Sequence, residues 1–70
     1  MKIEFWLFDK TTSSFNVVYF QKWNKRQPLF TSDPNNAKKY WHDWLAKEDV
    51  SLLQKAKSQT AITVSIKVVP

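Results

Sequence analysis

The sequence contains no glycine and no cysteine, and it has a single histidine among its 70 residues. The lack of glycine excludes the usual phosphate-cradling loops, which depend on it. The lack of cysteine excludes disulfides, and His42 with a few scattered carboxylates predicts no metal site and no bound cofactor. Long apolar runs are also missing: none approaches the roughly 18 residues of a membrane span.

The first ten residues, MKIEFWLFDK, do not fit a signal peptide, because Glu4 and Asp9 interrupt the apolar stretch that such a peptide needs. We therefore expect a cytoplasmic protein with no membrane partner.

Catalytic groups are scarce as well. His42 is the only imidazole, and its neighbour Asp43 would point about 100° away from it on a helix. Glu48 and Asp49 are adjacent near an expected helix boundary, where the simplest interpretation is a helix cap. The sequence therefore predicts a protein that is not an enzyme.

Positive charge and aromatic side chains are abundant. The net charge is +5, with a pI near 9.7, and ten of the eleven basic residues are lysines. Four tryptophans, five phenylalanines and two tyrosines supply apolar area to a chain that is otherwise too short for a large core. The charge favours polyanions or acidic protein surfaces as partners.

Three segments predict strands. Residues 2–9 alternate, with Ile3, Phe5 and Leu7 on one face, and residues 15–23 predict an antiparallel partner strand after a polar turn. In this second strand either Phe15, Val17 and Tyr19 or Val18 and Phe20 face the core. Residues 60–69 predict the third strand, whose buried face would hold Ile62, Val64, Ile66 and Val68.

A helical layer is predicted between the second and third strands. Ser32 or Asp33 is expected to cap it, and Pro34 suits its first position. Its apolar stripe comprises Ala37, Tyr40, Trp41, Trp44 and Leu45. Either one helix continues through the segment, or a second, capped by Asp49, uses Val50, Leu52, Leu53 and Ala56.

These elements predict a single α+β domain over residues 1–70. Its three-stranded antiparallel sheet, in β-β-α-β order, would have the helical layer on one face. If the last strand lies beside the first, the sheet order is second, first, third; pairing of the last strand with the second is the alternative.

Two surfaces are candidates for partner binding. Trp6 and Phe8 project from the face of the first strand opposite to the core and could stack on bases. Alternatively, the connection 23–31, with Trp23, Leu29 and Phe30, covers them, or a homodimer buries them.

The second candidate surface is basic. Its cations are Lys22, Lys25 and Arg26 from the stretch QKWNKRQP, together with Lys38 and Lys39. Trp23 would anchor this crossing. The set suits phosphate contacts that do not read sequence, because arginine, which reads base edges, is scarce. Ordinary solubility charge is the alternative.

In its size, its lack of catalytic groups and its predicted element order, the chain resembles the very small phage and mobile-element proteins that block a host defence or toxin complex. The resemblance transfers no residue. It implies an inhibitor, anti-CRISPR-like or antitoxin-like, that docks in the host cytoplasm on an acidic protein or nucleoprotein complex. The alternative is direct, sequence-nonspecific binding of nucleic acid.

Overall fold

The computed structural model describes residues 1–55 and 61–70. Its strands are β1 (Lys2–Asp9), β2 (Ser14–Asn24), β3 (Gln27–Thr31) and β4 (Ala61–Val69). A short 3-10 helix, η1 (Pro34–Asn36), and one α-helix, α1 (Asp43–Leu53), lie between β3 and β4. The chain is therefore α+β, as expected.

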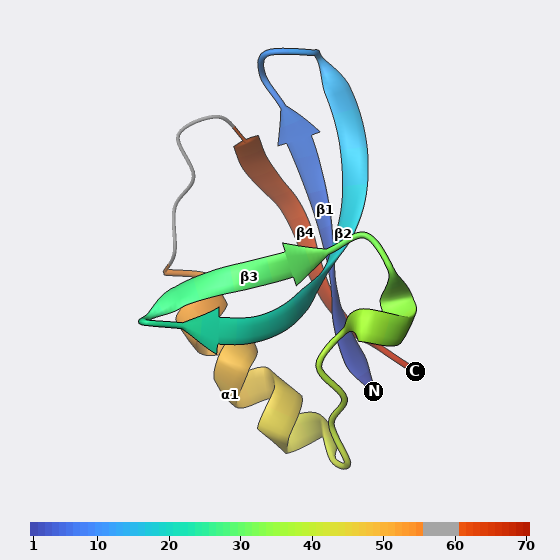
Figure 1. Cartoon of the computed structure of the whole chain (residues 1–70), viewed down its shortest axis with the longest axis vertical. Coiled ribbons are helices and arrows are strands. Elements are labelled where there is room, and N and C mark those ends of the chain that lie inside the picture. The colour runs from blue at the N-terminus through green and yellow to red at the C-terminus, as the bar shows by residue number, and fades with distance from the viewer. Residues whose placement is uncertain (56–60) are drawn as a thin grey trace.

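The strands form one antiparallel sheet in the order β3-β2-β1-β4, so the last strand does lie beside the first. The expected three-stranded sheet and β-β-α-β order are wrong, because residues 27–31 form a fourth strand instead of a connection. A two-residue turn at Lys25 and Arg26 returns the chain along β2. Pro28 fits β3 because β3 is an edge strand, where a missing N–H is tolerated. Figure 1 shows that β2 curves and that β3 lies across the direction of β1 and β4.

The helical region also differs from the expectation. Asp33 does act as a cap, accepting a hydrogen bond from the backbone N–H of Asn35, but only one 3-10 turn follows. The backbone N–H of Lys38 then donates to Phe20 O at 2.9 Å, and that of Tyr40 donates to Met1 O at 2.8 Å. Because the sheet takes these donors, the segment runs extended and α1 begins only at Asp43.

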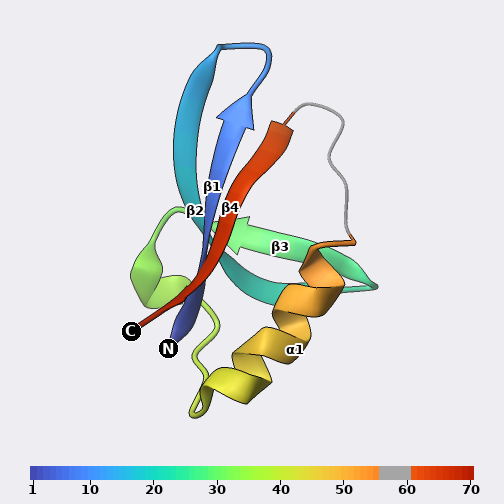
Figure 2. The ribbon, with the colours of Figure 1, turned by 180° about the vertical axis from the view of Figure 1, so that it is seen from behind.

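Helix α1 is continuous from Asp43 to Leu53, so no break occurs at Glu48 and Asp49 caps no second helix. Ala56, expected in that second helix, lies outside the described residues. Figure 2 shows α1 beside the sheet, with its last turn near the turn that joins β2 to β3. In the part of the chain that the structure describes, no helix is long and apolar enough to cross a membrane.

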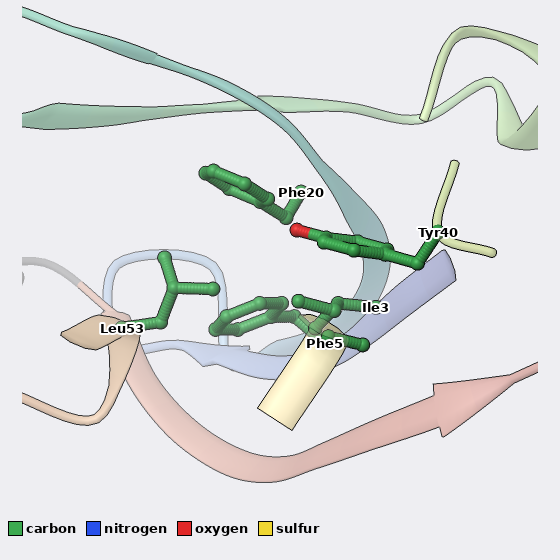
Figure 3. Close-up of a cluster of buried hydrophobic side chains, with 6 residues drawn as sticks. Ile3, Phe5, Phe20, Tyr40 and Leu53 are labelled. Atoms are coloured by element: carbon green, nitrogen blue, oxygen red, sulfur yellow. The ribbon is translucent and has the colours of Figure 1, made fainter. Parts of the chain in front are cut away.

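The core lies between the sheet and α1 (Figure 3). Its buried members are Ile3, Phe5, Phe20, Tyr40, Ala46 and Leu53. Val18 packs against this cluster, which settles the open question about β2: Val18 and Phe20 face the core, and Phe15 is exposed.

Strand β4 contains an irregularity that changes which side chains it buries. Trp6 pairs with Ser65, but the next residue of β1, Leu7, pairs with Thr63, so that Val64 is an extra, bulged residue. The bulge shifts the alternation along the strand. Ile66 and Val68 therefore pack against the core as expected, whereas Ile62 and Val64 are exposed.

Candidate binding surface

The turn between β2 and β3 carries two of the predicted site residues in an unfavourable backbone conformation. Lys25 has φ 51° and Arg26 has φ 68°, with Asn24 and Gln27 paired on either side. Positive φ at both central residues is the pattern of a type I′ turn, which favours Asn-Gly because a side chain with Cβ is costly there. The turn therefore holds two cations in a strained conformation.

Strand β2 joins the hairpin to β1 in the sheet, and near the turn the hairpin is also linked to α1 through Asp49. The Asp49 carboxylate accepts hydrogen bonds from Trp23 Nε1 at 3.2 Å, from Lys38 Nζ at 2.9 Å and from the Tyr40 hydroxyl at 2.5 Å. These donors come from two segments of the chain: Trp23 from β2, and Lys38 and Tyr40 from the extended stretch between η1 and α1. Asp49 thus joins the hairpin, the extended segment before α1, and α1 itself.

The environment of this carboxylate sets the charge states around it. Burial raises the pKa of Asp49, but the hydrogen bonds from Tyr40, Lys38 and Trp23 outweigh burial and hold its pKa below the ordinary value. Burial, reinforced by the hydrogen bond to Asp49, raises the pKa of Tyr40. Asp49 is therefore a carboxylate, and Tyr40 a neutral donor, at neutral pH.

Trp23 and Lys38 are committed to internal contacts. The Trp23 ring packs on Phe20 with centroids 5.1 Å apart, as expected of an anchor. The Lys38 ammonium pairs with Asp49 and also lies 5.1 Å from the centroid of the Tyr40 ring. The structure therefore brings these two predicted site residues to one carboxylate, and it leaves neither of them as a simple surface contact.

A groove lies between the hairpin and the C-terminal end of α1. It has a volume of about 550 Å³, and its described lining consists of Trp23, Arg26, Leu52 and Lys55. We call it the hairpin groove. Arg26 and Trp23 of the predicted site meet here with Lys55 and with Leu52, which was expected in the apolar part of a second helix.

Trp6 and Phe8 belong to a different surface, on the face of the sheet opposite to the core. Trp6 lines a shallow groove of about 360 Å³ with Phe15 and Val64, among others. Phe8 packs against Phe15 with ring centroids 5.1 Å apart. On this face, Trp6 is 40% exposed to solvent.

The connection expected to cover Trp6 does not do so with its aromatic rings. Trp23 packs on Phe20, and Phe30 lies 4.8 Å from Phe5, centroid to centroid, so both rings are on the core side. A homodimer over Trp6 stays a prediction.

An exposed aromatic group that the sequence pattern did not predict lies at the start of α1. Trp41 is 89% exposed and Trp44 56% exposed, although both were expected in the buried stripe. His42, expected within a helix beside Asp43, is instead exposed at the N-cap position and stacks on Trp44 with ring centroids 6.2 Å apart. Because the helix begins at Asp43, Trp41 is not part of its helical stripe.

Lys39 and Trp41 lie together. They line a shallow hollow of about 210 Å³ whose other walls include Tyr40, Glu48 and Asp49. The predicted basic patch is thus divided between the hairpin, with Lys22, Lys25 and Arg26, and this hollow.

Among residues 1–55 and 61–70, no group of three or more histidine, aspartate or glutamate side chains is placed to hold a metal ion. Comparison of the chain with protein-family models, with curated proteins and with solved structures found no match.

Proposed function

We propose that this protein acts by binding, and that it docks the cations of the β2–β3 hairpin on an acidic surface of a protein or nucleoprotein partner. The observation that carries this proposal is the turn: Lys25 and Arg26 occupy left-handed backbone positions that Asn and Gly would adopt at much lower cost.

A strained conformation in a small domain invites a functional explanation. Left-handed residues with a Cβ cost about 1–2 kcal/mol each, and a domain of this size has only about 3.5–10 kcal/mol of stability in total. Backbone strain tends to persist where function requires it. Ser13, in the turn between β1 and β2, also has a positive φ, but in the β2–β3 turn both strained residues are cations, which favours a role in contact with an acidic partner.

Inhibition of a host defence or toxin complex, by a phage or mobile-element protein in the host cytoplasm, is the form of this function that we propose. The small size and the high density of lysine support it, since positive charge steers a small protein toward an acidic or nucleic-acid-like groove. The extra strand β3 removes the similarity in element order on which the resemblance partly rested.

Direct binding of nucleic acid is the second candidate. The exposed Trp41 beside Lys39 supports it, because a base could stack on the indole while the lysine contacts phosphate. Two of the contacts that this function would use, Trp23 and Lys38, are already engaged by Asp49. We therefore rank it second.

A salt titration separates the two candidates. Binding to generic single- and double-stranded oligonucleotides is measured at two salt concentrations. Micromolar binding that weakens steeply with salt would support the nucleic-acid function. The docking function predicts no such binding to oligonucleotides.

The docking function is tested with a variant of the hairpin, Lys22→Gln/Lys25→Gln/Arg26→Gln. Proteins captured from a host lysate by the wild-type chain should be lost from this variant, while circular dichroism shows an unchanged fold. All three residues are exposed, so the substitutions should not disturb the core.

A matched control removes the same charge elsewhere, at three exposed lysines: Lys10, Lys47 and Lys67. This control should retain the captured partner. Equal loss from both variants would mean that net charge alone governs capture, and the docking proposal would then be wrong.

A further inference from the structure

We propose that the hairpin groove binds an acidic peptide segment of the partner through one apolar anchor side chain. This inference rests on the proposed docking function and names the kind of partner surface that the groove fits. Its volume of about 550 Å³ lies within the usual range of ligand sites.

The floor of the groove is apolar and ready to receive a side chain. Leu52 is 53% exposed although it adjoins the buried Leu53 on α1, so its apolar surface faces outward. Trp23 forms the opposite wall and is held by its hydrogen bond to Asp49 and by its contact with Phe20. Walls that are fixed before binding lower the entropic cost of association.

The rim of the groove supplies the charge. Every charged side chain in its described lining is positive: Arg26 comes from the strained turn and Lys55 from the residues that follow α1. The nearby carboxylate of Asp49 is compensated by Lys38 at 2.9 Å and does not oppose an anionic ligand as a free charge would. An arginine can also grip a carboxylate through two parallel hydrogen bonds.

Together, an apolar floor and a cationic rim are complementary to an acidic segment that contains an apolar residue. Nucleic acid fits less well, because the one aromatic ring in the described lining, Trp23, is only partly exposed and packs on Phe20, whereas the well-exposed side chain is the aliphatic Leu52. The wall at Trp23 has its indole N–H turned to Asp49, which leaves that donor unavailable to a base edge.

The test uses three short synthetic peptides and the full chain. The first peptide has one phenylalanine flanked by aspartates and glutamates. The second replaces the phenylalanine by serine, and the third replaces the acidic residues by their amides. The first should bind roughly tenfold or more tightly than either of the others, since burial of a phenyl ring and the charge pairing both contribute.

Nuclear magnetic resonance locates the bound peptide. The four tryptophans give four indole N–H signals, and only Trp23 lines the hairpin groove. Titration of the first peptide should shift the signal of Trp23 and leave that of Trp6, on the opposite face, unchanged. Shifts confined to Trp6 or Trp41 would overturn the assignment of the groove.

A pair of variants with matched exposure tests the anchor contact. Leu52→Gln should weaken binding of the first peptide about tenfold, whereas Val64→Gln should not change it. The two side chains are 53% and 56% exposed, so neither change disturbs the core. For the charge, Lys55→Gln should weaken binding severalfold and Lys10→Gln should not.

Two further results would overturn the inference. One is the absence of saturable binding of the first peptide at millimolar concentration, and the other is equal affinity for the peptides with and without phenylalanine. Neither result bears on the proposed docking function, which depends on partner capture by Lys22, Lys25 and Arg26. The docking function is wrong only if the triple hairpin variant and the charge control Lys10/Lys47/Lys67 capture the partner equally.

Discussion

Replacement of the turn residues by Asn-Gly should make the protein more stable. In Lys25→Asn/Arg26→Gly, the two backbone positions keep their φ values of 51° and 68° but carry residues that accept them. Relief of the left-handed strain contributes about 1–2 kcal/mol per residue, and the greater freedom of glycine in the unfolded chain offsets about 0.5–1 kcal/mol of it. Because asparagine keeps a Cβ and relieves only part of the strain at its position, we expect a net gain of about 1–2 kcal/mol in the free energy of unfolding.

Thermal and urea unfolding measure this gain. For a domain of this length, each kcal/mol shifts Tm by roughly 4–8 °C, so the Asn-Gly variant should melt about 5–15 °C higher than the wild type. The change also removes two positive charges from a chain of net charge +5, and reduced repulsion would stabilise it too. A control must therefore separate charge from backbone strain.

Lys25→Ala/Arg26→Ala is that control, because it removes the same charges but keeps a Cβ at both positions. It should melt close to the wild type. If the alanine variant gains as much as the Asn-Gly variant, the strain argument is refuted and charge repulsion explains the gain. The Asn-Gly variant should at the same time bind the partner more weakly, so that stability and binding change in opposite directions.

Three further predictions concern Asp49 and Trp41. Asp49→Ala should lose about 2–4 kcal/mol, or roughly 10–30 °C in Tm, since it leaves the Trp23 and Tyr40 donors unpaired in a partly buried site. Because the pKa of Asp49 is lowered in the folded protein, its carboxylate contributes fully to stability at pH values above the ordinary pKa of 3.8, and this contribution is lost as the pH falls below 3.8. In urea unfolding, the difference in the free energy of unfolding between wild type and Asp49→Asn should therefore become smaller below pH 3.8. Trp41→Ser should change Tm by less than about 3 °C, because the side chain is 89% exposed; a large loss would show that it packs in solution.

Strand positions were predictable because alternation is a local signal. Ile3 and Phe5 are buried as the pattern of residues 2–9 indicates, and the last strand pairs with the first. The bulge at Val64 was not predictable, because nothing in the alternating sequence TAITVSIKVV marks an extra residue. The register shift depends on the partner strand, which a single segment does not contain.

The fourth strand escaped prediction for a similar reason. A two-residue hairpin is normally recognised by Asn-Gly or Asp-Gly, and here the turn is Lys25-Arg26. The unusual residues that hid the turn are the same ones that suggest a function for it. Pro28 gives no strand signal of its own either, since proline is compatible with a strand only at an edge.

The helix boundary failed because tertiary hydrogen bonds decided it. Asp33 and Pro34 do start a helical turn, but Lys38 and Tyr40 then donate their backbone N–H groups to Phe20 and Met1. The periodicity of apolar residues in the sequence cannot reveal that these tertiary hydrogen bonds compete with helical ones. The exposure of Trp41, which the sequence assigned to the core, follows from this competition because Trp41 precedes the helix.

The contacts of Asp49 determine which residues of the hairpin groove can be substituted to test binding. Trp23 lines the hairpin groove but also packs on Phe20 and donates to Asp49, so any substitution of Trp23 changes stability and binding together. Leu52 and Arg26 line the groove from exposed positions, and their substitution leaves the contacts of Asp49 in place. If substitution of Leu52 or Arg26 weakens binding and leaves Tm unchanged, the groove itself contacts the ligand. If substitution of Trp23 weakens binding, the loss is explained equally well by release of the hairpin from α1.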